Sequence, residues 1–216
     1  MNRVPNPSLD RAILIHLTDK YKLNQKREGI HLSTLIYCLT RSFLDQSNME
    51  VAPTDEEVML FALGIGIQSE LTPSSASAPM YQFEGIYYSP DMVFSLNGDT
   101  VELKTTRSGA KRYVEGNYPE TWIEYIKGGC YILNKTEYNL SVLYLAERPV
   151  PKLISETLVF EREELEANWS YMIKRKEIYS EALKTNIVPT PYMYCKEWEC
   201  KNCRHSTICS ALSIKD

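Results

Sequence analysis

Two carboxylates and a lysine lie close together in the middle of this 216-residue sequence, where Pro90-Asp91 is followed by Glu102-Leu103-Lys104. The residues between them alternate between apolar and polar types. The alternation breaks at Asn97-Gly98, the dipeptide most typical of a two-residue hairpin turn. The pattern therefore predicts a β-hairpin that carries both carboxylates.

The expected two-residue turn fixes the register of this hairpin. With that dipeptide at its centre, Asp91 lies opposite Lys104 and Val93 lies opposite Glu102. Side chains two residues apart share one face of a strand, so Asp91, Glu102 and Lys104 are expected on the same face. The other face is apolar and is expected to pack into a core: it carries Met92, Phe94, Leu96, Val101 and Leu103.

This set of side chains has the chemistry of a hard-metal site. Carboxylate oxygens suit Mg²⁺ or Mn²⁺, and such an ion lowers the pKa of a bound water and screens charge on a phosphoryl group. Asp91 and Glu102 are therefore candidate metal ligands and catalytic residues. Lys104 could orient the attacking water or neutralise developing charge. The alternative is that Glu102 and Lys104 are ordinary solvated cross-strand charges, and the sequence alone leaves both interpretations open.

A second group of reactive side chains lies near the C-terminus. Cys200, Cys203 and Cys209 have the spacing C-x2-C-x5-C, Cys195 precedes them, and Cys38 lies far upstream. A C-x2-C turn directs two sulfurs to one point, so this density of thiols predicts ligation of a metal or a metal cluster. From spacing alone, the four C-terminal cysteines could also form a zinc site without Cys38.

The remaining cysteine and the rest of the chain argue against disulfides. Cys130 lies in an apolar segment beside Tyr131 and Ile132, where a small buried thiol is expected. A chain of this length can form a core without crosslinks, and its N-terminus has no signal-peptide pattern. The expected compartment is the reducing cytoplasm.

The carboxylate hairpin and the cysteines together resemble the RecB-like exonucleases of the PD-(D/E)XK superfamily, in particular the CRISPR-associated iron–sulfur exonucleases and their viral relatives. The resemblance spans about residues 30–210, and the segment around Cys38 is similar to the family's early Cys-Pro-Arg segment, with Leu39 replacing the proline. It implies an α/β fold: a PD-(D/E)XK nuclease core with a helical subdomain that holds a structural [4Fe–4S] cluster. The implied cluster ligands are Cys38, Cys200, Cys203 and Cys209.

The sequence departs from the family pattern in two places. Where the family has a metal-binding histidine after Gly-x-x-x, this chain has Gln68, which offers a neutral oxygen in place of an imidazole. The family's Gln-x-x-x-Tyr motif is best matched by Lys127 to Tyr131, and Lys127 could contact a DNA phosphate. The metal-binding positions implied by the resemblance are Gln68, Asp91, Glu102 and Leu103.

Composition and charge limit the possible partners. The chain is 44% hydrophobic and 24% charged, which is ordinary for a globular protein, and no apolar run is long enough to cross a membrane. Its net charge of -4 argues against a strongly basic surface, but residues 104–114 contain four cations and no acid. With the aromatics Tyr113, Tyr118 and Trp122 next to it, this segment either holds DNA phosphates and stacks unpaired bases or is a solvated loop. The candidate DNA-binding residues are Arg107, Lys111, Arg112 and Lys127.

The elements expected around these residues form a single domain over residues 1–216. N-terminal helices over about 8–70, one of which starts with a capping box formed by Thr54 and Glu57, precede a core over about 80–160. A long helix from Glu161 to about Lys184 and a cysteine tail over about 190–212 close around the core. The expected core elements are strands at about 80–88, 91–96 and 99–106, a helix at about 119–135, and strands near 139–147 and 153–160.

The sequence therefore predicts a metal-dependent deoxyribonuclease, acting as an exonuclease on single-stranded DNA ends. The family resemblance implies DNA and CRISPR integrase proteins, or the replication and recombination machinery of a virus or mobile element, as partners. The alternative is a non-catalytic iron–sulfur protein that binds DNA or acts as a scaffold, in which Gln68 marks a degraded site. A zinc-stabilised interaction module is a third possibility.

Overall fold

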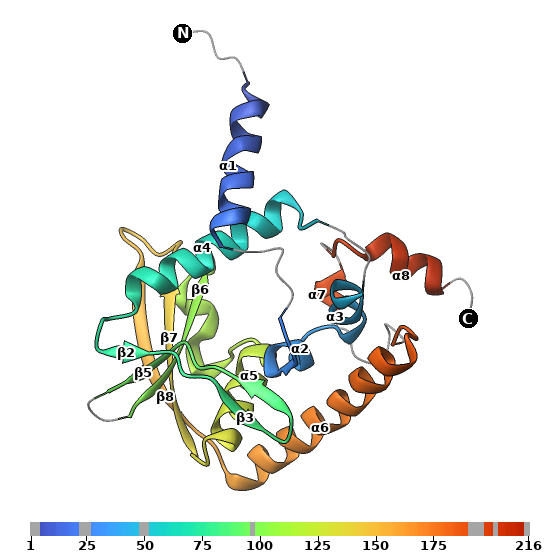
Figure 1. Cartoon of the computed structure of the whole chain (residues 1–216). Coiled ribbons are helices and arrows are strands. Elements are labelled where there is room, and N and C mark those ends of the chain that lie inside the picture. Colours follow the sequence, from blue (N-terminus) through green and yellow to red (C-terminus); the bar gives the residue numbers. More distant parts are fainter. Residues whose placement is uncertain are drawn as a thin grey trace.

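The computed structural model describes residues 5–21, 27–47, 52–95, 98–189, 197–200 and 203–213. The chain is a mixture of helices and short strands, as the alternating sequence patterns predict (Figure 1). Its helices are α1 (Pro7–Lys20), α2 (Leu32–Ile36), α3 (Leu39–Gln46), α4 (Asp55–Leu71), the 3₁₀ helix η1 (Ala110–Gly116), α5 (Glu120–Ile132), α6 (Arg162–Thr185), α7 (Glu197–Cys200) and α8 (Ser206–Ser213). Its strands are β1 (Ile30–His31), β2 (Ala76–Ser77), β3 (Tyr81–Phe83), β4 (Ile86–Tyr88), β5 (Met92–Phe94), β6 (Thr100–Thr106), β7 (Glu137–Tyr144) and β8 (Lys152–Val159).

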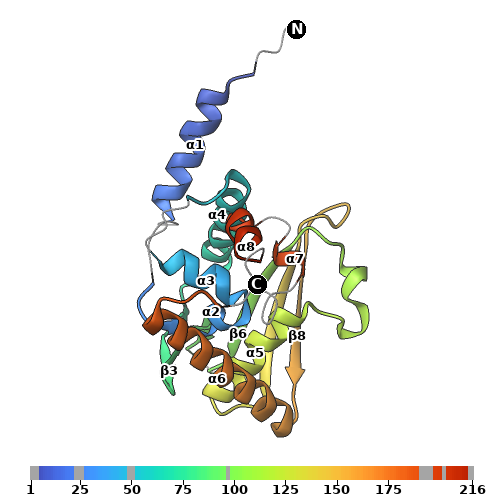
Figure 2. The same ribbon diagram turned by 90° about the vertical axis from the view of Figure 1, so that its right-hand side faces the viewer.

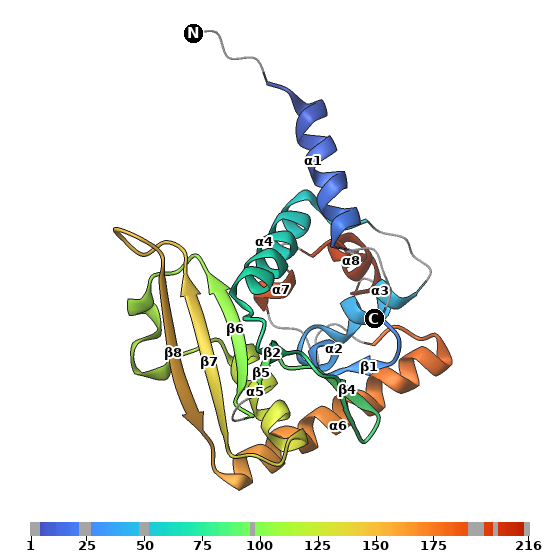
Figure 3. The ribbon, with the colours of Figure 1, turned by 60° about the vertical axis from the view of Figure 1, so that its left-hand side comes forward.

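The main sheet has five strands in the order β2-β5-β6-β7-β8. Strands β6 and β7 are parallel, with α5 in the connection between them, and the other pairs are antiparallel. In Figure 3 the strands are seen with α5 behind them. The large hydrophobic core lies on this helical side, where alternate residues of β7 such as Leu140 and Val142 meet Ile126 and Cys130 of α5. The expected order of strands and helix in the core is therefore confirmed.

The period of two along β6 separates the core from the site. Val101 and Leu103 point to the opposite face of the sheet, where they form a second, smaller cluster with Met92. Glu102 and Lys104, which alternate with them, consequently face the helical side. The expected apolar face of the hairpin is thus confirmed for these residues, while Leu96 and Asn97 lie outside the described part of the chain.

The segment expected as one strand over 80–88 is instead a tight hairpin, so that expectation was wrong. Glu84 and Gly85 both have positive φ, 46° and 74°, and they reverse the chain between β3 and β4. Glycine adopts such a φ without strain, and two successive positive φ values fit the right-handed twist of a hairpin. These strands form a separate three-stranded sheet in the order β1-β4-β3. Strand β2 was also missed, because its two residues lie in a stretch that reads as a loop.

The N-terminal helices differ in how much of them is buried. Helix α1 has no buried residue, extends away from the rest of the molecule, and contacts α4 (Figures 1 and 2). An Arg11–Asp55 ion pair of 3.5 Å joins the two helices. The capping box expected at the start of α4 is confirmed: Thr54 Oγ1 accepts from the Glu57 N–H, and the Glu57 carboxylate accepts from the Thr54 N–H.

The C-terminal tail returns to the N-terminal helices. Asp45 of α3 accepts hydrogen bonds from the Arg204 guanidinium and from Nε2 of His205, the latter at 2.7 Å. Arg204 also lies 3.7 Å from the carboxylate of Glu57. Figure 2 shows α8 beside α3 and α4. These contacts place the two cysteine-bearing segments of the chain next to each other. Within the described residues, none of the helices has the length and apolar character needed to cross a bilayer.

Candidate functional site

The hairpin of β5 and β6 is paired two residues away from the expected register. Met92 pairs with Val101 and Val93 with Thr100, so Asp91 comes opposite Glu102 rather than opposite Lys104. The loop is longer than expected because the N–H of Phe94 donates to Asp99 O and the N–H of Gly98 donates to Phe94 O. A shift of two residues preserves the face of every side chain, whereas a shift of one would invert it.

The expected grouping of Asp91, Glu102 and Lys104 on one face is therefore found, although the pairing that predicted it was wrong. Asp91 lies just before β5 and is held at both oxygens. Its Oδ1 accepts from Nε2 of Gln68 at 2.9 Å, and its Oδ2 accepts from the main-chain N–H of Leu103 at 2.7 Å. Leu103 thus reaches the site through its main chain, while its side chain packs on the other face of the sheet.

Glu102 is the most deeply buried acid of the group, with 2% of its surface exposed. Its Oε1 pairs with Nζ of Lys104, and its Oε2 is buried without a hydrogen-bond partner in the described structure. Burial raises the pKa of Glu102 to about 8; the Lys104 charge opposes this rise, and the nearby Asp91 charge adds to it. Burial likewise raises the pKa of Asp91, against the effects of Lys104, Leu103 and Gln68.

Lys104 is the cation of the site. Burial opposes its charge, but the carboxylates of Glu102 and Asp91 outweigh that effect and raise the pKa of Lys104. Its Nζ also lies 5.4 Å from the centre of the Tyr125 ring, within the range of a cation–π contact. The amine of Lys104 therefore lies between the Glu102 carboxyl group and the face of the Tyr125 ring.

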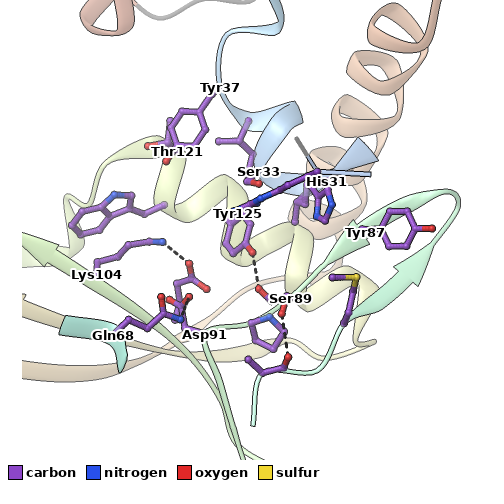
Figure 4. Close-up of a pocket in the computed structure, with 18 of the residues that line it drawn as sticks. His31, Ser33, Tyr37, Gln68, Tyr87, Ser89, Asp91, Lys104, Thr121 and Tyr125 are labelled. Atoms are coloured by element: carbon purple, nitrogen blue, oxygen red, sulfur yellow. Dashed lines mark hydrogen bonds and ion pairs between the residues drawn. The ribbon is translucent and has the colours of Figure 1, made fainter. Parts of the chain in front are cut away.

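These side chains form one wall of a cavity of about 740 Å³. In Figure 4, Gln68, Asp91 and Lys104 lie together, with Tyr37 and Ser33 across the cavity from them. The rings of His31 and Tyr87, whose centres are 5.5 Å apart, line another part of the cavity. Aromatic side chains around the cavity are Tyr37, Tyr87, Trp122 and Tyr125.

Helix α5 contributes cavity residues that the sequence interpretation missed. Thr121, Trp122 and Tyr125 line the cavity, and the Tyr125 hydroxyl donates to Ser89 O at 2.8 Å. Thr121 and Tyr125 have the same four-residue spacing as the Gln-x-x-x-Tyr pattern, which is the signal that could have identified them. The expected match is elsewhere: Lys127 Nζ donates to Glu164 at 2.8 Å, and Tyr131 stacks on a tryptophan of α6. Neither of these lines the cavity.

The basic segment lies outside the cavity but next to it. Arg107, Lys111 and Arg112 are exposed on the connection between β6 and α5. The neighbouring aromatics stack on one another: the Tyr113 ring centre is 5.7 Å from those of both Tyr118 and Trp122. Because Trp122 also lines the cavity, the aromatic group connects the basic segment to the carboxylates.

The structure brings four predicted cysteines together. Cys38 is buried at the N-cap of α3, where its sulfur accepts from the Arg41 N–H at 3.5 Å. Burial, together with the nearby Cys203, Cys38 and Cys200 thiols, raises the pKa of Cys209 to about 11. Burial also raises the pKa of Cys203, with Cys38 adding to the rise. Cys195 lies outside the described residues. Cys130 is fully buried in the main core, as expected.

Two more buried polar atoms accompany these thiols. The main chain of His205 hydrogen-bonds to Cys203. Its ring Nδ1 and Oε1 of Glu199 are buried and have no hydrogen-bond partner within the described part of the chain. The other Glu199 oxygen accepts from the main-chain N–H of Cys38 at 2.8 Å. Among the described residues, no three His, Cys, Asp or Glu side chains form a group that could hold a single metal ion.

Comparison with known proteins gives the fold. No protein-family model and no curated protein matches the sequence. The crystal structure of SSO0001 is similar over 94% of this chain and 97% of its own, with a TM-score of 0.58 and 16% identity. An alkaline exonuclease from Laribacter hongkongensis is similar over 73% of this chain and 91% of its own, with a TM-score of 0.50 and 7% identity. A phage-related exonuclease from Haemophilus somnus matches less closely, with a TM-score of 0.47, 7% identity, and 78% and 99% of the two chains covered. The chain therefore has a mixed α/β fold that is similar to the fold of a known exonuclease.

Proposed function

We propose that this protein is a Mg²⁺- or Mn²⁺-dependent deoxyribonuclease that trims single-stranded DNA ends as an exonuclease. The observation that carries the proposal is the buried Glu102, paired with Lys104 and placed beside Asp91 at the wall of the cavity. Desolvated acids with a cation between them are typical of catalytic sites rather than of solvated surface pairs. The fold supports the proposal, because one structure that shares it is an alkaline exonuclease.

The donor atoms of the site fit a hard cation. Glu102, whose Oε2 has no hydrogen-bond partner in the described structure, and Asp91 line the same cavity, and Mg²⁺ is commonly held by one or two carboxylates with waters and substrate phosphates. Gln68, which is hydrogen-bonded to Asp91 through its nitrogen, lines that cavity too and has an amide oxygen that could serve as a further ligand. When bound there, Mg²⁺ or Mn²⁺ would lower the pKa of a water and screen phosphoryl charge.

Asp91, Lys104 and Glu102 would each have a separate role in the reaction. Asp91 is oriented by two hydrogen bonds, which fixes the direction of its lone pairs. Lys104, held charged by its acidic neighbours, is placed to neutralise charge that develops on the scissile phosphate. Burial of Glu102 excludes water from its side of the site, so that each charge acts in a less polar surrounding than bulk solvent.

The lining of the cavity favours an unpaired DNA end as substrate. Tyr37, Trp122 and Tyr125 present rings within the same cavity as the acids. Aromatic rings stack on the faces of unpaired bases without reading their sequence, whereas the bases of a duplex already stack on each other. The exposed Arg107, Lys111 and Arg112 would contact phosphates further along the strand.

We also propose that Cys38, Cys200, Cys203 and Cys209 hold a [4Fe–4S] cluster. The proposal is supported by the placement of the Cys38, Cys200 and Cys203 thiols near Cys209, and four thiolates are the usual ligand set of such a cluster. The cluster would connect α3 to the tail and stabilise the fold.

The family resemblance extends the proposal to a biological setting. A single-strand exonuclease of this kind would prepare DNA ends for the CRISPR integrase, or would serve the replication or recombination of a virus or mobile element.

The direct test is cleavage of end-labelled single-stranded DNA by anaerobically purified protein with Mg²⁺ or Mn²⁺. We expect products that shorten progressively from one end, and we expect none with Glu102→Gln or Lys104→Ala. An exposed substitution, Lys184→Ala, is the matched control for Lys104→Ala. Metal-independent cleavage, or cleavage that survives both site variants, would contradict the proposal.

One observation favours a second function, a non-catalytic scaffold that binds DNA. Both oxygens of Asp91 already accept hydrogen bonds, from Gln68 and from Leu103, which reduces the lone pairs left for a cation. Such a protein would bind single-stranded DNA with the same affinity in EDTA as in Mg²⁺ and would leave the strand intact. The assay above, run beside a binding assay, separates the two functions.

A further inference from the structure

A two-residue segment joins the cysteines to the cavity. Helix α2 ends at Ile36 and α3 begins at Leu39, and neither residue between them is helical: Tyr37 is extended, with φ -90° and ψ -176°, and Cys38 has φ -56° and ψ 116°. Successive side chains in an extended chain point to opposite sides. Tyr37 accordingly lines the cavity, whereas Cys38 is buried among the thiols.

Helix α6 holds this segment from one side. Arg175, which is only 2% exposed, donates through Nε to Leu35 O and through Nη2 to Tyr37 O, the latter at 2.6 Å. These carbonyls belong to the end of α2, where helical carbonyls have lost their partners within the helix. A buried, planar guanidinium with fixed donor directions therefore sets the path of the main chain on both sides of Ile36.

The cysteine tail holds the same segment from the other side. Glu199 of α7, immediately before Cys200, accepts the main-chain N–H of Cys38 at 2.8 Å. An N–H that donates to a carboxylate makes a stronger hydrogen bond than one between two neutral groups. The position of Tyr37 thus depends on a residue 161 positions after Cys38 in the sequence.

Tyr37 is placed to meet a substrate. The whole residue is 39% exposed. Figure 4 shows the Tyr37 side chain across the cavity from Lys104. Charges on both sides act on it: Lys104 and Glu102 in the cavity and Glu199 in the tail. Burial raises the pKa of Tyr37, so its side chain is uncharged and its ring can stack on a base.

We propose that Tyr37 is a substrate-binding residue that stacks on the nucleotide next to the scissile phosphate of a single-stranded DNA end, and that Glu199 and the cysteine tail are what position it. This inference rests on the proposed function for its substrate. It makes the cysteine-held group part of substrate binding and not only of overall stability.

The first test is the affinity for a fluorescent single-stranded oligonucleotide, measured by anisotropy with Ca²⁺ in place of the catalytic ion. We expect Tyr37→Ala to weaken binding by about 5- to 150-fold, which corresponds to the loss of one stacked base, and Tyr37→Phe to retain most of the affinity. Phe61→Ala on α4 is the matched control, because Phe61 is exposed to a similar extent, 43%, and lies outside the cavity. Equal affinity of Tyr37→Ala and wild type would overturn the proposal.

The second test examines the positioning by the tail. We expect Glu199→Ala to raise the KM for single-stranded DNA while kcat and the iron and sulfide content stay near wild type. The Glu199→Ala, Tyr37→Ala double variant should bind no more weakly than Tyr37→Ala alone, because both changes remove the same contact. Additive losses of affinity would show that Glu199 acts independently of Tyr37 and would overturn this part.

The two failures can be told apart. If the wild type binds DNA but never cleaves it, the nuclease proposal fails, and the anisotropy comparison still tests Tyr37. If the wild type cleaves and Tyr37→Ala cleaves with an unchanged KM, the nuclease proposal stands and the role of Tyr37 is rejected. A wild type that neither binds nor cleaves single-stranded DNA rejects both.

Discussion

Gln68 donates a hydrogen bond to Asp91 across 2.9 Å and so ties the end of α4 to the start of β5. This bond favours the charged form of Asp91, against the effect of burial. The Gln68 amide therefore supports the Asp91 carboxylate without being an acid or a base.

Replacing the amide by an imidazole should strengthen metal binding. An imidazole ligates Mn²⁺ better than an amide oxygen does, and the gain should be smaller for Mg²⁺, which prefers oxygen. We expect Gln68→His to lower the Mn²⁺ concentration for half-maximal cleavage by about tenfold. The measurement is a metal titration of the cleavage rate, with Gln68→Ala as the control. An unchanged Mn²⁺ requirement would show a site adapted to the amide.

Metal binding should depend on pH through Glu102. Its pKa of about 8 in the metal-free protein lies above the ordinary value of 4.5, so the carboxyl keeps its proton at neutral pH and must lose it to bind a cation. Mn²⁺ affinity should rise as pH increases toward about 8 and then level off. Calorimetry at pH 6.5 and 8.5 would measure this, and the titration should release a proton at the lower pH. A pH-independent affinity would contradict it.

The raised pKa of Glu102 also predicts how the stability of the metal-free protein changes with pH. Between about pH 4.5 and 8 the folded state binds a proton at Glu102 that the unfolded state has released. The free energy of unfolding should therefore fall as pH rises through this window. Glu102→Gln, which is neutral at every pH, should flatten that dependence in chemical denaturation experiments. A wild type and a variant with parallel pH profiles would show that other groups control the trend.

Removing the cation should affect chemistry more than DNA binding. We expect Lys104→Ala to lower the single-turnover cleavage rate by about 100- to 1000-fold, as for other groups that stabilise transition-state charge. The loss leaves Glu102 buried without its partner, and the carboxyl should respond by holding its proton more tightly. Equal losses in rate and in DNA affinity would indicate a binding role for the lysine instead.

The basic segment should control the salt dependence of DNA binding. Substituting Arg107, Lys111 and Arg112 together by alanine should reduce the slope of log affinity against log salt by about 2, since each phosphate contact on a single strand contributes about 0.7. Lys127→Ala is the informative comparison, because its amine is engaged by Glu164. We expect a smaller change in slope for that single substitution than for any single substitution in the segment.

Iron and sulfide analysis should identify the cysteine-held group. Anaerobically purified protein is expected to contain about four iron and four sulfide per chain. Cys38→Ser and Cys209→Ser should lose iron and lower the melting temperature, whereas Cys130→Ala, in the main core, should keep its iron. Zinc in place of iron, retained in Cys38→Ser, would identify the C-terminal zinc site instead.

The sequence predicted the shared face of the three candidate site residues on the hairpin but not the pairing of its strands. Alternation has a period of two, so Asp91, Glu102 and Lys104 share a face in any register that differs by an even number of residues. The register itself follows from the loop, where Gly98 is the last residue of a longer turn and not the second residue of a short one. That choice is a matter of loop hydrogen bonds, which the alternation does not encode.

Contacts between distant elements were the least predictable. The bond from Gln68 to Asp91 and the placing of Tyr37 depend on how α4 and α2 pack against the sheet, and no local pattern in the sequence reports that packing. On α5, the pair Thr121 and Tyr125 and the pair Lys127 and Tyr131 have the same four-residue spacing. Which pair faces the cavity depends on how α5 is oriented against the sheet, and the structure places Tyr125 there while Tyr131 packs on α6. The meeting of Cys38 with the tail was expected from the family resemblance, not from spacing.

The bond between Cys38 and Glu199 also has a consequence for synthesis of the chain, because its partners are 161 residues apart. A ribosome adds roughly 5–20 residues per second, so Glu199 is synthesised roughly 10–30 s after Cys38. During that time the thiol and the exposed end of α2 have no native partner from the tail. Assembly of the cysteine site therefore has to follow synthesis of nearly all of the described chain.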